Sequence, residues 1–145
     1  MSASASLAFA TAVVFVWLGM VLAISFLEAP LKFRAPGVTV QIGLGIGRLV
    51  FRALNRVEVV LAAILLVALL VAAPPARVLL GAGLSVVVLL VQVAMVRPLL
   101  ARRSDRVLAG EEPPRSRAHL VYVGFEVVKV VLLAGAGIST LVAIA

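Results

Sequence analysis

Four long apolar runs constrain what this chain can fold into. They cover Leu7–Leu27, Val57–Ala73, Val78–Val96 and His119–Ala143. Each run approaches or exceeds the roughly 17–25 residues that cross a bilayer as a helix. Soluble domains are about 45–50% apolar, whereas 64% of these residues are hydrophobic, which is too much apolar surface for a soluble fold of this size. The sequence therefore predicts an all-α integral membrane four-helix bundle that forms one domain over residues 1–145.

The basic residues predict how this bundle is oriented. Four spans place both termini on the same side of the membrane, and the loops after the first and third spans share the other side. Those loops, 28–57 and 97–118, carry eleven of the thirteen Lys and Arg residues. Because basic loops stay in the cytoplasm, we expect a multi-pass protein of the bacterial inner (plasma) membrane, with both termini outside and both basic loops cytoplasmic.

An amphipathic segment at 42–56 precedes the second span. Arg48, Arg52 and Arg56 recur every four residues, which places them on one helix face. We expect this stripe to lie along the cytoplasmic membrane surface and to bind anionic lipid headgroups. The three glycines between Gly43 and Gly47 resemble a phosphate-binding turn, but no strand precedes them and the P-loop Lys-Ser/Thr is missing. A flexible or closely packed helix start is the favoured interpretation.

Glu126 and Lys129 are the most informative polar residues. They lie inside the fourth apolar run, three residues apart and therefore on one helix face. Ionisable residues inside a membrane are costly, and they usually face the bundle interior. One interpretation is a proton or substrate relay that includes Tyr122, one turn away. The other is an internal ion pair that fixes helix packing, and the sequence does not decide between them.

Three more polar residues belong to the predicted intramembrane set. Gln92 is expected to hydrogen-bond across helices. Glu28 and Glu58, at the cytoplasmic ends of the first two spans, have two interpretations. Either they join Glu126 in a carboxylate cluster or, as we favour, each pairs with a nearby cation: Glu28 with Lys32, and Glu58 with Arg56 or Arg97.

The composition also argues against several kinds of chemistry. The chain has no cysteine and a single histidine, His119. Thiolate chemistry, Cys-ligated zinc and iron–sulfur clusters are therefore excluded, and little scope remains for a histidine metal site. No nucleophile–base pair and no nucleic-acid recognition motif is visible. We expect no metal, no cofactor, no nucleic-acid partner and no enzymatic activity.

Two stretches of the chain carry a resemblance to known proteins. WLGMVLAISFLEAPLKF at 17–33 and GRLVFRALNRVE at 47–58 resemble a family of uncharacterised small bacterial four-helix transmembrane proteins. A more distant similarity is to the copper-resistance-D-type membrane domain, in which the first helix often ends with Pro and Phe. Haem- or metal-associated members of that domain use histidines within their helices. The first helix has none here, so the resemblance implies the four-helix fold without copper or haem.

Two functions compete, and a third, a membrane enzyme that uses only the carboxylates of Glu28, Glu58 and Glu126, is the least favoured. The first is a homo-oligomeric transport-type protein that uses the intramembrane Glu126–Lys129 pair; four helices of this length rarely enclose a pathway alone. The second is a non-catalytic accessory or scaffolding subunit of a larger membrane complex, which the scarcity of polar chemistry favours. The partners expected from either are membrane lipids with anionic headgroups, and further copies of the chain or other membrane proteins.

Overall fold

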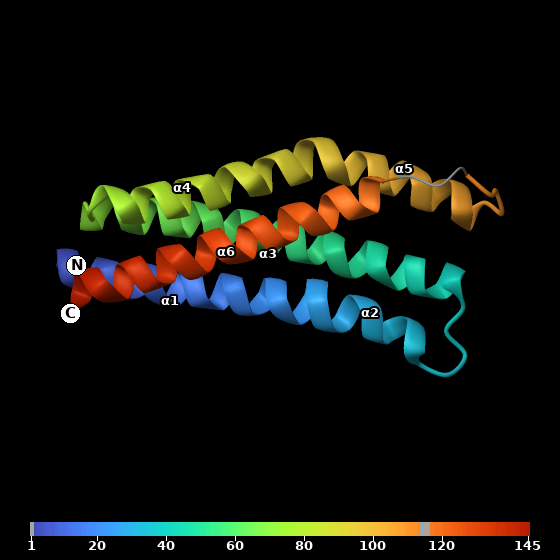
Figure 1. Cartoon of the computed structure of the whole chain (residues 1–145), viewed down its shortest axis with the longest axis horizontal. Helices are drawn as coiled ribbons and strands as arrows, with labels where there is room; N and C mark the ends of the chain where they lie inside the picture. The colour runs from blue at the N-terminus through green and yellow to red at the C-terminus, as the bar shows by residue number, and fades with distance from the viewer. Residues whose placement is uncertain (1, 114–116) are drawn as a thin grey trace.

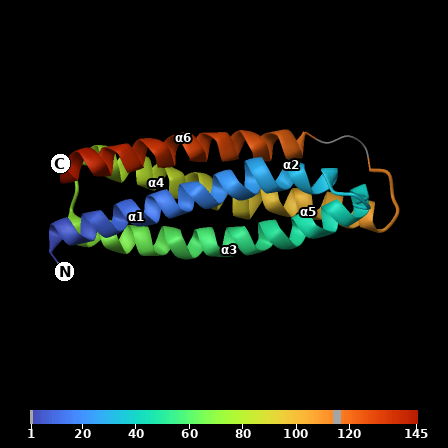
Figure 2. The same ribbon diagram turned by 90° about the horizontal axis from the view of Figure 1, so that it is seen from below.

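The computed structural model describes residues 2–113 and 117–145, and it shows four long helical rods packed side by side in alternating directions (Figure 1). Each rod is long and apolar enough to cross a membrane. The two termini lie at one end of the bundle, and the connections at 35–39 and after Leu108 lie at the other (Figure 2). We call this second end the basic end. The predicted all-α four-helix membrane bundle is confirmed.

Two of the four rods are single helices. The second rod is α3 (Val40–Ala72), which begins where the Thr39 hydroxyl accepts a hydrogen bond from the Ile42 N–H at 3.2 Å. It ends at Ala73, whose backbone is left-handed (φ 46°), directly before Pro74 and Pro75. Proline lacks the N–H donor that a continuing helix needs. The fourth rod is α6 (Ala118–Ile144).

The first and third rods share an unusual construction, in which a π-helical segment precedes a proline. The first rod runs through α1 (Ala3–Val21), the π-helix η1 (Leu22–Glu28), α2 (Ala29–Leu31) and the 3-10 helix η2 (Lys32–Arg34). The third runs through α4 (Ala76–Val91), the π-helix η3 (Gln92–Val96) and α5 (Arg97–Leu108). A proline ring clashes with the carbonyl four residues earlier. For Pro30 and Pro98 that carbonyl lies inside the π-helix, where the wider turn makes room for the ring.

The helices therefore reach well beyond the predicted spans. A helix of 33 residues, such as α3, is about 50 Å long at 1.5 Å per residue, against a hydrocarbon core of about 30 Å. Most of the two predicted loops, 28–57 and 97–118, is helical: residues 40–56 form the first half of α3, and 97–108 form α5. Because Pro30 does not end the first rod, the connection after it shrinks to residues 35–39.

Each helical rod packs against two neighbours. α1 packs against α3 and α6, and α4 packs against α6, so that sequential rods are adjacent around the bundle (Figure 2). Trp17 fills the middle of the interior, fully buried, together with Leu65 and Leu133. Gly81 allows α4 to approach α6, because a Cβ on this residue would lie 3.3 Å from the Ala136 Cα. The half of the bundle near the termini is consequently tightly packed.

Candidate functional site: a buried polar network beside a basic cavity

Lys129 is the centre of a polar network buried in the bundle. Its side chain is fully buried, and its Nζ lies 2.9 Å from the Glu126 Oε1, so the structure pairs the two residues that the sequence singled out. The same Nζ lies 2.5 Å from the Glu58 Oε1 and 2.8 Å from the Gln92 Oε1. One ammonium group from α6 thus joins side chains from α3 and η3. This arrangement satisfies all three Nζ donors.

The partner predicted for Glu58 was wrong. We expected Arg56 or Arg97, but the carboxylate pairs with Lys129, and its Oε1 also accepts a hydrogen bond from the Trp17 indole at 2.9 Å. The physical reason is that Glu58 and Arg56 lie on different faces of α3. Glu58 points into the bundle and is fully buried, whereas Arg56, two residues earlier, lies on an exposed face. Residues two apart do not share a helix face.

Both π-helical segments supply hydrogen bonds to Glu126. The Ser25 hydroxyl of η1 donates to the Glu126 Oε2 at 2.8 Å, and the Gln92 amide of η3 donates to the Oε1 at 2.7 Å. Gln92 therefore hydrogen-bonds across helices, as its position in the third span suggested. Ser25 was missed by the sequence reasoning, although Pro30 and Pro98 mark the places where the helices depart from α geometry. π-Helical turns occur often at functional sites.

Asn55 links this network to a further cation. In the amide orientation that satisfies both neighbours, its nitrogen donates to the Glu58 Oε2 at 3.2 Å and its oxygen accepts from the Arg97 Nε at 2.8 Å. The connected side chains then contain two carboxylates, Glu58 and Glu126, and two cations, Lys129 and Arg97. Their formal charges cancel, which makes burial of so many charged groups tolerable. We call the connected side chains of Trp17, Ser25, Asn55, Glu58, Gln92, Arg97, Glu126 and Lys129 the buried network.

A cavity of about 290 Å³ opens beside this network at the basic end. Residues of all four rods line it. Three cations, Lys32, Arg48 and Arg97, contribute to its wall together with His119, and Glu126 also lines it. Most of the remaining lining is apolar. Glu126 is therefore both a member of the buried network and part of the cavity wall.

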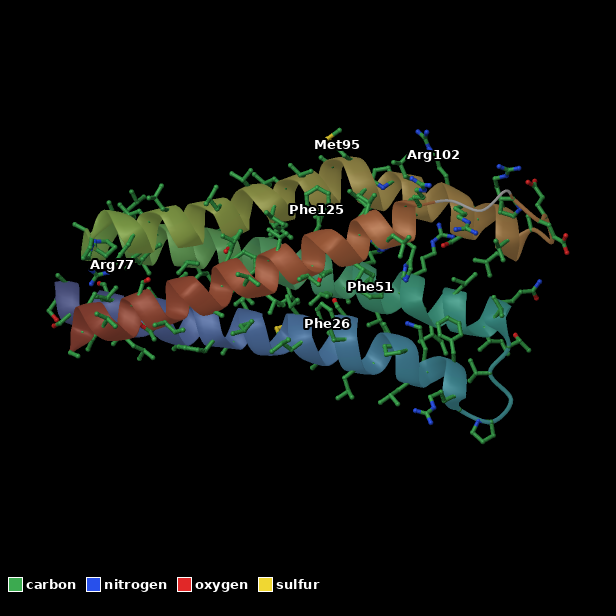
Figure 3. The ribbon with its side chains drawn as sticks, in the orientation of Figure 1. Phe26, Phe51, Arg77, Met95, Arg102 and Phe125 are labelled. Carbon is green, nitrogen blue, oxygen red and sulfur yellow. The ribbon has the colours of Figure 1, made fainter. Side chains whose placement is uncertain are left out.

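Phe51 contacts two of the cations in the cavity wall. Its ring lies 5.5 Å from the Lys32 Nζ and 5.7 Å from the Arg97 guanidinium carbon, and both contacts are in the range of cation–π interactions. Tyr122 packs edge-on against the same ring, with centroids 5.5 Å apart. The Tyr122 hydroxyl is buried and makes no hydrogen bond of normal geometry, although the Glu126 carboxylate is close enough to interact with it. Figure 3 shows Phe51 in the basic-end half of the bundle.

The remaining predicted residues lie around the cavity or away from it. Glu28 pairs with Lys32 at 3.3 Å, as expected, and stays apart from the other two carboxylates. Of the predicted lipid-binding stripe, Arg48 pairs with Asp105 of α5, whereas Arg52 and Arg56 border a shallow groove with Val59. The stripe thus follows a helix that continues through the bundle. Lipid binding by it stays a prediction.

Two of the three glycines at the start of α3, Gly43 and Gly47, serve close packing, whereas a Cβ on Gly45 would meet nothing within 4 Å. A Cβ on Gly43 would lie 2.2 Å from the Phe33 ring, and one on Gly47 would lie 2.9 Å from the Lys32 Nζ. These contacts support the packed helix start over the phosphate-binding turn. Within residues 2–113 and 117–145, no three His, Cys, Asp or Glu side chains come together in a way that could hold a metal ion.

Comparison with known proteins adds no assignment. No protein-family model, curated protein or solved structure matches this chain. The chain is a multi-pass membrane protein by its four apolar helices. The resemblance to uncharacterised small bacterial transmembrane proteins and to the copper-resistance-D-type domain stays a prediction.

Proposed function

We propose that this chain is a small, non-enzymatic transport-type protein of the bacterial inner membrane, in which Glu126 passes protons between the basic-end cavity and the buried network. The main support for the proposal is that Glu126 belongs both to the buried network and to the cavity wall. Its carboxylate is 1% exposed and bonded to Lys129, Gln92 and Ser25, and it also lines the cavity. A proton that enters from the basic end therefore meets an acceptor already connected to the centre of the bundle.

The charge balance of the buried network supports a role in proton movement. Glu58 and Glu126 both lie within 3 Å of the single Lys129 ammonium. A proton added to one carboxylate changes the net charge of a site whose central side chains, Glu58, Glu126 and Lys129, are shielded from solvent. The hydrogen bonds around Lys129 must then rearrange, because a protonated carboxyl donates where a carboxylate accepts. Such a rearrangement is the change that a relay requires.

A single copy of the bundle offers protons no open path beyond Lys129. The half of the bundle near the termini is filled by fully buried side chains such as Val14, Leu65 and Leu133. In our proposal the chain works as a homo-oligomer, with the second half of the path opening where copies meet. The termini lie outside and the basic end faces the cytoplasm, in line with the distribution of Lys and Arg.

Proton flux into proteoliposomes tests the proposal. Purified protein is reconstituted into vesicles that contain a pH-sensitive dye, and a potassium diffusion potential set with valinomycin drives protons inward. We expect the native protein to acidify the vesicles and Glu126→Gln, which keeps the shape of the side chain, to lower the rate at least tenfold. Glu111→Gln is the matched control, because Glu111 pairs with Arg106 at the exposed connection outside the cavity.

The proposal fails if native protein acidifies vesicles no faster than empty liposomes, or if Glu126→Gln has no effect. Oligomeric state is measured on the same preparation by native mass spectrometry in mild detergent. A single self-associated species agrees with the proposal. A different membrane protein present at constant stoichiometry would instead indicate the accessory or scaffolding subunit, in which the buried network only fixes helix packing.

A further inference from the structure

The basic-end cavity holds a cation that has no carboxylate partner. Among the residues that the structure describes, no Asp or Glu oxygen lies within 4.0 Å of the Arg97 guanidinium, in contrast to Lys32 and Arg48. Its Nε donates to the Asn55 amide oxygen, and the group lies over the Phe51 ring. Arg97 is only partly exposed and lines the cavity wall. Its charge is balanced only indirectly, by Glu58 through Asn55 and electrostatically by Glu126, so the guanidinium lacks a direct carboxylate contact.

Further positive charge surrounds Arg97. Lys32 lies over the same Phe51 ring, and Arg48 and Arg52 are close enough to interact electrostatically with the guanidinium. Like charges held together at the mouth of an apolar cavity repel one another more strongly than in water, since the local dielectric constant is lower. Such an arrangement is stabilised by an anion that binds among the cations. The guanidinium fork is suited to a carboxylate or phosphate group.

The rest of the cavity indicates what the anion carries. Phe26, Phe33 and Leu44 are among the apolar side chains that line it. Its volume of about 290 Å³ lies near the lower end of the roughly 300–1,000 Å³ of small-molecule sites. The buried Tyr122 hydroxyl lies on the same wall, close enough to the Glu126 carboxylate to interact with it, and adds a polar group there. The site therefore suits a short apolar body as well as an anionic headgroup.

We infer that the basic-end cavity is a binding site for an amphiphilic anion, a carboxylate or phosphate attached to an apolar chain, with Arg97 and Lys32 as its headgroup ligands and Phe51 as the residue that positions both. This inference rests on the cavity of the proposed transport function and names the class of molecule that enters it. Because the helices are longer than the hydrocarbon core is thick, we expect the cations at the basic end to lie near the level of lipid headgroups. Both a membrane lipid and a free amphiphile have the required chemistry.

Equilibrium binding to the full chain tests the inference. The protein is placed in nanodiscs of neutral phosphatidylcholine and titrated by calorimetry with hexyl phosphate, with hexanol as the uncharged probe and inorganic phosphate as the headgroup alone. We expect saturable binding of hexyl phosphate, at least tenfold tighter than that of either control. Hydrogen bonds to charged groups are stronger than those between neutral groups, so Arg97→Gln should weaken hexyl phosphate binding about tenfold or more.

Matched variants separate the site from general surface charge. Arg102→Gln removes a cation from the same helix, five residues away, that points out of the bundle in Figure 3 and does not line the cavity. We expect it to leave the affinity unchanged. Because Arg97→Gln also removes a charge from the buried network, Lys32→Gln is the second variant, and it should weaken binding with the Trp17 fluorescence spectrum unaltered.

The two sources of the anion are distinguished by the lipid. If phosphatidylglycerol added to the nanodisc abolishes hexyl phosphate binding, and Arg97→Gln lowers the retention of that lipid in native mass spectra, the natural ligand is a lipid headgroup. If hexyl phosphate still binds, the ligand is a free amphiphile. The inference is overturned if hexyl phosphate binds no better than hexanol, or if Arg102→Gln weakens it as much as Arg97→Gln.

This test is independent of proton flux. Proton flux and hexyl phosphate binding are measured on the native protein in separate assays, so that either can fail without the other. Flux without anion binding would remove the inference and leave the proposed function. Anion binding without flux would remove the proposed function and leave the inference.

Discussion

Substitution of Lys129 tests how the buried network is connected. The Nζ group has three acceptors, on Glu58, Glu126 and Gln92, and none of these side chains is more than 1% exposed. Lys129→Met keeps most of the side-chain volume and leaves two carboxylates facing each other without a cation between them. Removing one partner of a buried ion pair costs about 3–5 kcal/mol. We expect a loss of that size, a large part of the roughly 5–15 kcal/mol that stabilises a typical domain.

The double and triple variants distinguish a pair from a network. If Lys129 served Glu126 alone, Lys129→Met combined with Glu126→Gln would restore stability, because no unpaired charge would remain. In the structure Glu58 also depends on Lys129, at 2.5 Å. We therefore expect the double variant to remain about 3 kcal/mol less stable than the native protein. Adding Glu58→Gln should recover most of the loss, since a neutral cluster of similar volume is often as stable as a buried ionic one.

Unfolding in mixed micelles measures these differences. The protein is titrated with SDS, and unfolding is followed by the fluorescence of Trp17, the single tryptophan, whose indole donates to Glu58. Arg106→Gln is the control, because its pair with Glu111 is half exposed and such pairs contribute at most about 1 kcal/mol. Full recovery in the double variant, or a single variant no worse than Arg106→Gln, would refute the network.

Two further predictions concern helix packing and orientation. Gly81→Ala should destabilise the protein by about 1–3 kcal/mol in the same SDS titration, since its Cβ would press on the Ala136 backbone. Gly83→Ala, where a Cβ meets nothing within 4 Å, should be neutral or stabilise by up to about 1 kcal/mol, and equal effects of the two would contradict the α4–α6 packing. Because the chain has no cysteine, Ala109→Cys in intact cells should react only with membrane-permeant maleimide, whereas Ala145→Cys should react with impermeant reagent; the opposite pattern would reverse the topology.

Much of the architecture could be predicted from the sequence alone. Uninterrupted apolar runs near the length of a bilayer leave few alternatives to spanning helices, because an unpaired backbone polar group is costly in lipid. The helix ends were harder to predict. Proline usually interrupts a helix, but a π-helical segment precedes both Pro30 and Pro98 and lets each helix continue. That outcome depends on contacts with another rod, because Ser25 and Gln92 of these segments donate hydrogen bonds to Glu126 of α6.

The candidate site, too, could be predicted from the sequence only in part. The sequence was sufficient to single out Glu126 and Lys129, since two ionisable residues in an apolar run, three apart, share one face and must find partners. It could not determine that Lys129 also pairs with Glu58, or that Asn55 and Trp17 bond to Glu58, because these residues lie on other helices, at least 68 positions away from Glu126. The spacing of residues along one helix determines which side chains share a face. The rotation of the helices against each other determines which side chains of other helices contact that face. Only the tertiary structure therefore joined the carboxylates through one lysine and placed the cavity beside them.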